Sequence, residues 1–420
     1  MFEVITKPLD HQVQGSLFIT RQKFAGLFMT MGTGKTLTAL IGVCELKKKA
    51  LVVCPPFLVQ NWIREIRIHT KLTVGYNFQK FEEGYDIYII PYTRLDKASE
   101  WFEKVDIVIA DEMHYLKNLD AKRTQKFHVL MSDHTPEFFW GLTGTPLKNR
   151  IGEIYSFLLL LSKSPMTKTK ITDRYKSFYL FANRFMNVKQ QRIGGRMITK
   201  FDGAKNIEEL RTYVNPYCFA KSINPADLPE LQETSVTVNY DKDPELLKAF
   251  MDYCNGVGAV DIAMKCKSAS AKAQYTAEYV KEIVDSEAGP VVVFSDHREP
   301  LNIMELHLAG YRVRQINGDV SMGKRDEYVQ MLQKGQLDFL LCTIGAASVG
   351  YNMTAASTVV FNDISWVPGD NAQAIKRIHR IGSTKTCRVV YIVGSDADTY
   401  IIKTNKNKNK IIQGANFGNQ

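Results

Sequence analysis

The sequence lacks the features of a secreted or membrane-spanning protein. It has no run of about 18 apolar residues, so no transmembrane helix is predicted. The segment from Met1 to Asp10 has no apolar core of the kind a signal peptide needs. None of the seven cysteines forms a C-x-x-C pair, which argues against a zinc site and a disulfide framework. We therefore expect a protein of a reducing, intracellular compartment.

Acidic residues are also in deficit. The chain of 420 residues carries 44 Asp and Glu against 54 Lys and Arg, a net charge of +10. Such a surplus favours a polyanionic partner, although a merely soluble basic protein has the same balance. With 45% hydrophobic and 23% charged residues the composition is that of a globular protein, and the length exceeds one ordinary core. We expect two domains with an insertion.

What the sequence does contain is a phosphate-binding loop between an apolar run at 25–29 and a predicted helix at 37–46. Backbone N–H groups of such a loop turn towards anionic oxygens, Lys35 reaches the β- and γ-phosphates, and the Thr36 hydroxyl ligates Mg²⁺. Met29 stands where the pattern has Gly, so a glycine-rich turn without a ligand is the alternative. The loop residues are Met31, Gly32, Thr33, Gly34, Lys35 and Thr36.

Two carboxylates follow a later apolar run at 105–110. Asp111 and Glu112 at the end of a buried strand are costly unless they meet a cation or a proton donor. Downstream of a phosphate loop the natural cation is Mg²⁺, which Asp111 would hold directly or through water, while Glu112 would orient and polarise the attacking water. The alternative is an acidic turn at the end of a strand.

Continuous apolar runs bounded by turn residues predict buried strands of parallel sheets. In the first half of the chain they lie at 50–54, 85–90, 105–110 and 138–142. In the second half they lie at 290–294, 311–316, 337–342, 358–362 and 389–393. Strands and helical segments alternate, so the predicted fold class is α/β, with two mostly parallel sheets that carry helices on both faces.

The turn-rich segment 224–229 is the predicted domain boundary. It separates a first domain at 1–225 from a second at 226–402. The last segment, 403–420, alternates Lys with polar residues, and we expect a basic, flexible tail there.

An insertion of helices and a hairpin is predicted at about 162–215 of the first domain. The hairpin at 187–200 turns at Gly194-Gly195 and is basic. Two interpretations stay open: the hairpin contacts nucleic-acid phosphates, or it is a solvated face.

Four polar side chains outside the loop and the acidic pair also suit a nucleotide site. Gln12 could pair with both the donor and the acceptor on the edge of adenine, but a solvated helical Gln looks the same. The second half has no phosphate loop, yet Gln373, Arg377 and Arg380 have helical spacing i, i+4, i+7 and would share one face. Arginines on that face could neutralise phosphoryl charge; a solvated amphipathic helix is the alternative.

Together these motifs resemble the SNF2 family of superfamily 2 helicases and translocases, over about residues 8 to 395. The acidic strand end continues through Lys117 to Asn118, as in the SNF2 form of the DEAD/DEAH box. Segments 142–149, 318–325 and 378–382 resemble, in turn, the third motif, the stretch after motif IV and the end of motif VI.

Details within the resemblance point to one branch of the family. Segments 343–350 and 366–369 are most similar to the fork-remodelling, annealing-helicase subgroup. The compact chain is similar to motors encoded by bacteriophages. Residues 216–222 resemble a basic brace after the first lobe, with Ala220 where the family usually has Arg.

The resemblance implies two RecA-like domains that bind ATP and Mg²⁺. Gln12 would read adenine, and Gln373, Arg377 and Arg380 would complete the site from the second domain. The residues implied to couple hydrolysis to domain movement are His114, Thr143 and Thr145. The residues implied to contact DNA are Pro56, Tyr92, Lys117, Asn118, Ser295, Gly318 and Thr343.

The expected function is therefore that of an ATP-dependent DNA translocase or helicase on duplex or branched DNA, in replication, recombination or repair. We expect a monomer in the cytoplasm or nucleoid, with replication or recombination proteins as further partners. An RNA-directed helicase is one alternative, opposed by the Lys-Asn after the acidic box and by the Arg-Ile-Gly ending. A DNA clamp switched by ATP is another, opposed by the acidic pair and both arginines.

Overall fold

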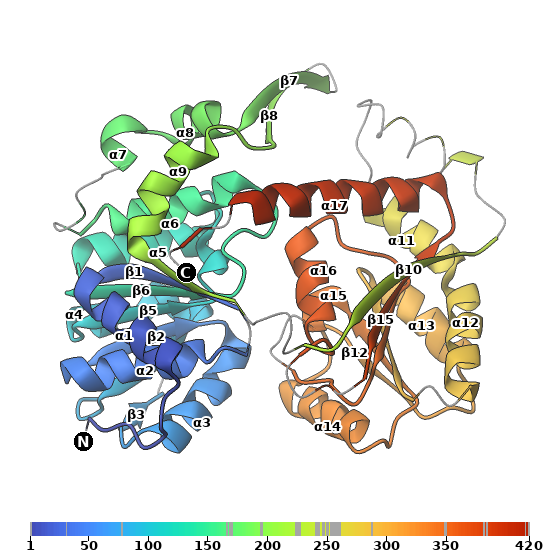
Figure 1. Cartoon of the computed structure of the whole chain (residues 1–420), viewed down its shortest axis with the longest axis horizontal. Coiled ribbons are helices and arrows are strands. Elements are labelled where there is room, and N and C mark those ends of the chain that lie inside the picture. The colour runs from blue at the N-terminus through green and yellow to red at the C-terminus, as the bar shows by residue number, and fades with distance from the viewer. Residues whose placement is uncertain are drawn as a thin grey trace. The chain divides into compact units, whose positions relative to one another are not determined.

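The computed structural model describes most of the chain, and its two compact units are described separately below (Figure 1). Among the residues described, no helix combines the length and the apolarity needed to cross a membrane. The described residues are 2–30, 32–76, 79–164, 167, 171–193, 196–222, 228–239, 244–245, 248, 252, 262–286, 289–347, 351–380, 383, 385–415 and 417–418.

The two units do not follow the chain in two simple halves. Unit 1 comprises 1–189, 200–223 and 411–420, and unit 2 comprises 190–199 and 224–410. The main division at 223/224 lies at the start of the turn-rich segment 224–229 and two residues before the expected boundary at 225/226, whereas the last ten residues belong to unit 1.

Unit 1 is built on a seven-stranded sheet in the order β3-β4-β2-β5-β6-β1-β9, with every described pair parallel. All residues of its five central strands are buried, as expected for a parallel sheet covered on both faces. The strands are β1 (Phe24–Met29), β2 (Ala50–Cys54), β3 (Val74–Gly75), β4 (Ile87–Pro91), β5 (Ile107–Asp111), β6 (Phe138–Thr143) and β9 (Cys218–Lys221).

Alternate residues of these strands feed two separate cores. Val52 and Ile109 pack with residues of α1 (Asp10–Gln22), α2 (Lys35–Leu46) and α3 (Val59–His69). Val53 and Val108 face the other core, which contains residues of α4 (Ser99–Glu103), α5 (Lys122–Asp133) and α6 (Ile154–Leu161). Short 3-10 turns connect these elements at Pro56–Leu58, Tyr92–Lys97, Met113–Leu116, Ile151–Glu153 and Asn215–Tyr217.

The segment predicted as an insertion contains helices and a hairpin. Strands β7 and β8 form a separate two-stranded sheet, and the Gly194-Gly195 turn predicted between them lies outside the described residues. Lys189 and Lys200 are exposed there. The elements are α7 (Ile171–Arg174), α8 (Phe178–Phe185), β7 (Asn187–Ile193), β8 (Arg196–Asp202) and α9 (Ile207–Val214).

Unit 2 contains a six-stranded sheet in the order β10-β15-β14-β11-β13-β12, again with parallel neighbours throughout the described pairs. The expected fold class, two mostly parallel sheets with helices, is confirmed. The strands are β10 (Leu231–Thr237), β11 (Val291–Ser295), β12 (Val313–Ile316), β13 (Phe339–Thr343), β14 (Thr358–Phe361) and β15 (Cys387–Val393).

Helices flank this second sheet. Helices α12 and α13 share a core with β11, β13 and β14, and Figure 1 shows α14, α15 and α16 on the opposite side of the sheet. The helices are α11 (Ile262–Ala271), α12 (Ala273–Asp285), α13 (Arg298–His307), α14 (Met322–Gln333), α15 (Ile344–Ala347), α16 (Pro368–Ile375) and α17 (Asp396–Ala415).

The expectation of a flexible tail from residue 403 is wrong, because α17 continues to Ala415. The alternating Lys and Asn residues suggested a solvated segment, but one face of the helix is used for packing. Ile401 and Asn405, one turn apart, are buried, and Asn405 Nδ2 donates to Ser365 O at 3.1 Å. Burial of one helical face outweighs the polar composition.

The end of the chain is fixed to unit 1. Arg211 donates to the last carbonyls of α17, with Nη2 2.8 Å from Gly414 O and Nε 3.0 Å from Ala415 O. Phe417 is buried in the unit 1 core, and Gly418 N donates to Asn215 Oδ1 at 2.9 Å. The Arg211 bonds satisfy helix-terminal carbonyls that would otherwise need water.

Gly418 is specifically required in this arrangement. Its φ is +105°, and a Cβ at this position would lie 2.6 Å from Cβ of Ala220. We expect Gly418→Ala to lower stability by roughly 1–3 kcal/mol and to make the C-terminal segment more sensitive to proteolysis, because both backbone strain and crowding arise. Thermal unfolding and limited proteolysis measure the two effects.

The matched control is Gly310→Ala, since Gly310 has a φ of +96° but open space around its Cβ position. That variant should show strain alone and no release of the C-terminus. Equal proteolysis of the two variants at the C-terminus would contradict the crowding argument.

Candidate functional site

The phosphate loop joins buried β1 to the start of α2. Gly32 and Gly34 have φ values of +87° and +81°, a left-handed conformation that favours glycine. Lys35 Nζ donates to Met29 O at 2.9 Å, so the lysine curls back over the loop. Met31 lies outside the described residues. The local geometry is that of a loop whose backbone turns around an anion at a helix N-terminus.

Gln12 lies directly against this loop. Its Oε1 accepts from Leu9 N at 2.9 Å, and its Nε2 donates to Thr33 O at 3.4 Å. A Cβ on Gly34 would come within 2.1 Å of Gln12 Nε2. The residue is 5% exposed. Gln12 therefore contacts the phosphate loop, and its reading of adenine stays a prediction.

Asp111, the last residue of β5, is held at every oxygen. Its Oδ2 accepts from the indole Nε1 of Trp62 and its Oδ1 from Glu112 N, both at 2.8 Å. Its backbone oxygen accepts from the Tyr92 hydroxyl at 2.9 Å. The sequence identified Asp111 by position, but nothing in the local pattern marked Trp62 or Tyr92 as its partners.

The sheet brings the acidic pair and the phosphate loop to one edge. Strand β6 lies between β5 and β1, and both Asp111 and Leu27 align with Leu142. The positive charge of Lys35 lowers the pKa of Asp111 and of Glu112, an effect that requires proximity. The two motifs, some 80 residues apart in sequence, therefore form one site.

Burial and neighbouring charges shift the pKa values of the two carboxyls in opposite directions. Burial, and secondly the charge of Glu112, raises the pKa of Asp111 above its usual value. Burial also acts to raise the pKa of Glu112, but the neighbouring imidazole of His114 and the charge of Lys35 outweigh it, so the pKa of Glu112 lies below its usual value. Glu112 is thus the more acidic of the two carboxyls and is ionised near pH 7, so it is suited to accept a hydrogen bond or a proton from water.

This donor set fits Mg²⁺. A hard divalent cation prefers carboxylate and hydroxyl oxygens, and Asp111 and Thr36 present one of each at the strand end and the helix start. A cation would also relieve the cost of burying Asp111. Thr36 and Asp111 are the residues that would hold it.

The three residues expected to couple hydrolysis to movement form a chain of contacts. His114 Nδ1 lies 3.1 Å from Glu112 Oε2 and 3.4 Å from Thr143 Oγ1. Thr145 N donates to that same hydroxyl at 3.1 Å. Burial lowers the pKa of His114 despite Glu112, so the imidazole is neutral near pH 7. The end of β6 is therefore connected to the acidic pair.

The predicted DNA contacts in unit 1 have different surroundings. Pro56 and Asn118 are exposed. Lys117 is half-buried, and its Nζ forms an ion pair with Glu153 at 2.7 Å. A phosphate contact by Lys117 would have to compete with that carboxylate.

Tyr92, also expected to contact DNA, has a buried side chain in this structure, and its contact with DNA stays a prediction. The side chain is 3% exposed, its hydroxyl donates to Asp111 O, and its ring stacks on Tyr115 with the ring centroids 5.8 Å apart. Tyr92 begins a 3-10 turn that directs the ring inward, where its hydroxyl bond supports the end of β5 beside the acidic pair.

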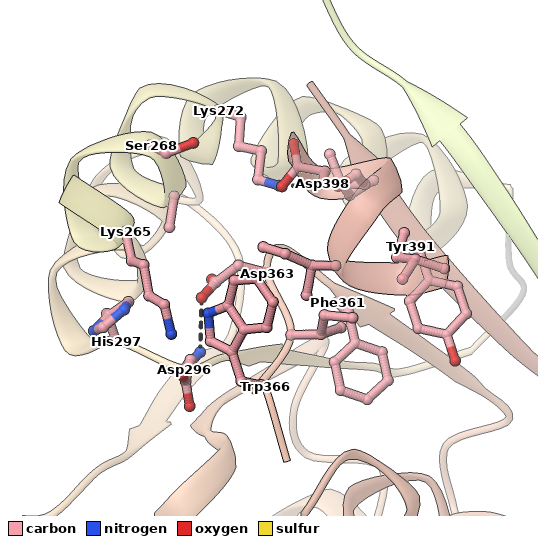
Figure 2. Close-up of a pocket in the computed structure, with 15 residues that line it drawn as sticks. Lys265, Ser268, Lys272, Asp296, His297, Phe361, Asp363, Trp366, Tyr391 and Asp398 are labelled. Atoms are coloured by element: carbon pink, nitrogen blue, oxygen red, sulfur yellow. Dashed lines mark hydrogen bonds and ion pairs between the residues drawn. The ribbon is translucent and has the colours of Figure 1, made fainter. Parts of the chain in front are cut away.

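In unit 2, Ser295 and Thr343 are adjacent on β11 and β13. Ser295 is buried, and its Oγ donates to Asp363 at 2.5 Å. Asp296 N donates to the same carboxylate at 3.1 Å, as the dashed line in Figure 2 shows. Gly318 is exposed in a loop.

The pocket of Figure 2 lies beside these strand ends. Lys265 is placed over the Trp366 ring, 4.9 Å from its centroid. Burial lowers the pKa of Lys265, opposed by Asp296 and Asp363. Mixed charge of both signs gives this pocket no clear preference for an anion or a cation.

The prediction that Gln373, Arg377 and Arg380 share one helical face is wrong. Helix α16 ends at Ile375, and only Gln373 lies within it. Arg377 O accepts from Met353 N at 2.9 Å, so a tertiary bond replaces the helical one and the chain continues in tight turns. Arg377 is 2% exposed, whereas Arg380 is half-buried, and burial lowers its pKa.

Comparisons with known proteins agree with this architecture. The family model "SNF2-related domain" matches residues 19–247, and "Helicase conserved C-terminal domain" matches residues 275–382.

Curated relatives match over most of this chain. The Drosophila melanogaster SWI/SNF-related matrix-associated actin-dependent regulator of chromatin subfamily A-like protein 1 is 27% identical, covering 96% of this chain and 55% of the relative. The Mus musculus DNA annealing helicase and endonuclease ZRANB3 is 24% identical, covering 93% and 39%. The chain thus spans about half the length of these relatives, or less.

A solved structure is also similar. The Sulfolobus solfataricus SWI2/SNF2 ATPase core in complex with dsDNA has a TM-score of 0.45 and 19% identity, covering 98% of this chain and 94% of that chain. The SNF2-related model alone matches more than half of the 420 residues. The chain therefore belongs to the SNF2 family of superfamily 2 helicases and translocases.

Proposed function

We propose that this protein is an ATP-dependent motor that moves on duplex or branched DNA. The observation that carries the proposal is the buried acidic pair, Asp111 and Glu112, beside Lys35 of the phosphate loop in a member of the SNF2 family. The relative named as a DNA annealing helicase and endonuclease supports DNA as the polymer.

Each residue of the site has a proposed task. Lys35 and the loop amides, with Gln12 against the loop, bind the nucleotide. Mg²⁺, held by Thr36 and Asp111, would neutralise phosphate charge. Glu112 accepts a proton from the attacking water or orients it. Gln373, Arg377 and Arg380 act on the nucleotide from unit 2 when ATP is bound.

Movement on DNA requires that hydrolysis changes the relation of the two lobes. We assign His114, Thr143 and Thr145 to this coupling because their contacts join Glu112 to the end of β6. A nucleotide that binds one conformation more tightly shifts the population towards it. The DNA contacts proposed are Pro56, Tyr92, Lys117, Asn118, Ser295, Gly318 and Thr343.

We further propose the biological setting expected from the sequence: a bacteriophage motor for replication, recombination or repair, acting as a monomer in the host cytoplasm beside replication or recombination proteins. Lobe boundaries at 1–225 and 226–402 are part of the proposal. The boundary between the two compact units at 223/224 supports them.

DNA should stimulate ATP turnover more than RNA does. We expect forked and duplex DNA to raise the rate about tenfold or more, and RNA of the same sequence much less, because only the matching polymer shifts the population towards the active conformation. Steady-state ATPase assays with forks, four-way junctions, duplexes and single strands measure this.

Two outcomes would overturn the DNA-motor proposal. Equal stimulation by RNA and DNA would favour the RNA-directed helicase. Tight, ATP-dependent DNA binding without turnover would favour the ATP-switched clamp. Glu112→Gln protein provides the control for contaminating ATPases.

A further inference from the structure

Trp62 has an unusual environment for a core tryptophan. It lies on α3, is fully buried, and packs among the aliphatic residues of one face of the unit 1 sheet. A buried indole N–H needs an acceptor, and most such donors in a core find a neutral one. The acceptor here is the carboxylate of Asp111, 2.8 Å from Nε1.

The bond determines how the carboxylate is oriented. Glu112 N holds Oδ1 while Trp62 holds Oδ2, so the plane of the Asp111 carboxylate is fixed at both oxygens. The Tyr92 hydroxyl holds the backbone oxygen behind it. Bonds to a charged acceptor are stronger than neutral ones, and the partners of a metal ligand orient it and tune its affinity.

We propose that Trp62 is a positioning residue for the metal–nucleotide site: its indole N–H holds the Asp111 carboxylate in the orientation that receives Mg²⁺. The inference rests on the proposed function, because it assigns Asp111 to the metal. A residue on α3 thus takes part in a site whose recognised motifs lie on the phosphate loop and on β5.

Trp62→Phe removes the donor and keeps an aromatic ring in the core. We expect the Mg²⁺ concentration for half-maximal nucleotide binding to rise about 10- to 100-fold, because a metal ligand has lost its orienting partner. Binding of a fluorescent ATP analogue during a Mg²⁺ titration measures it without turnover. High Mg²⁺ should restore much of the ATPase rate.

Trp140→Phe is the matched control. Trp140 is also fully buried in the same core, but its Nε1 donates to a backbone oxygen, Ile19 O, at 3.2 Å. It should lose stability to a similar degree and keep the wild-type Mg²⁺ dependence. A Trp62→Phe protein with the Mg²⁺ dependence of Trp140→Phe would overturn the proposal.

A measurement on the wild type does not depend on either variant folding. The indole N–H resonance of Trp62 should shift when Mg²⁺ is added to the ADP-bound protein, and that of Trp140 should not. An unchanged Trp62 resonance overturns the inference. A wild type without any Mg²⁺-dependent nucleotide binding overturns the proposed function instead.

Discussion

Glu112→Gln is expected to bind ATP with near wild-type affinity and to hydrolyse it roughly 10² to 10⁴ times more slowly, the range in which a positioned general base contributes. The substitution keeps the shape of the side chain but removes the charge. The carboxylate has a pKa below its usual value despite its burial, so it is ionised and ready to accept from water at neutral pH.

The geometry around Glu112 makes this test specific. Its backbone is left-handed, with φ +47°, and its N–H donates to Asp111. Strain of this kind at a non-glycine residue persists only where the surroundings fix it. Since Gln preserves both the backbone and the side-chain length, loss of turnover would report the carboxylate and not a collapsed loop.

Nucleotide binding by fluorescence and single-turnover hydrolysis separate the two effects. Glu45→Gln is the control, because Glu45 is exposed on α2, the helix that begins at Lys35. It should leave both quantities unchanged. Near-normal turnover in Glu112→Gln would remove Glu112 from its proposed role.

The fold was predictable where burial dictates a continuous apolar run. Strands β2, β5, β6 and β11 lie within two residues of their expected bounds because they are buried on both faces. The edge strand β10 was not predicted. Nearly all its residues are exposed, so no apolar pattern marks the strand. Its pairing with β15 depends on contacts between segments that are far apart in the sequence.

The candidate site likewise has a part that the sequence predicts and a part that it does not. The phosphate loop and the acidic pair are local motifs whose chemistry depends on adjacent residues, and the parallel sheet necessarily brings them to one edge. The partners of Asp111 come from elsewhere in the chain. Trp62 reaches Asp111 from the core, and its hydrogen bond to Asp111 depends on the packing of α3 against the sheet.

The arginines show the limit of helical spacing. A spacing of i, i+4, i+7 predicts one face only while the helix lasts, and α16 ends before Arg377. The carbonyl of Arg377 bonds to Met353 N instead of continuing the helix. Nothing in the sequence of the motif indicates that Met353, in a separate loop, bonds to Arg377. The two arginines have similar sequence settings, yet Arg377 is buried and Arg380 is half-buried.

That difference leads to the second large effect. Arg380→Ala should lower ATP turnover about 10³-fold, the lower end of the effect of an arginine that stabilises a transferring phosphoryl group. DNA binding and thermal stability should change little, because Arg380 is only half-buried. Arg377→Ala should lose both turnover and stability, since a nearly fully buried guanidinium, 2% exposed, leaves a cavity and unpaired neighbours.

Turnover, DNA affinity and melting temperature, measured for both variants, separate these roles. Arg388→Ala is the control, because Arg388 is an exposed arginine on β15 of the same unit. Arg380→Lys keeps the charge but lacks the planar fork, so it should recover only part of the rate. If Arg380→Ala hydrolysed ATP at the wild-type rate, the nucleotide site would not need this arginine of unit 2. Hydrolysis would then have to be coupled to lobe movement through Arg377 or through the contacts that join His114, Thr143 and Thr145.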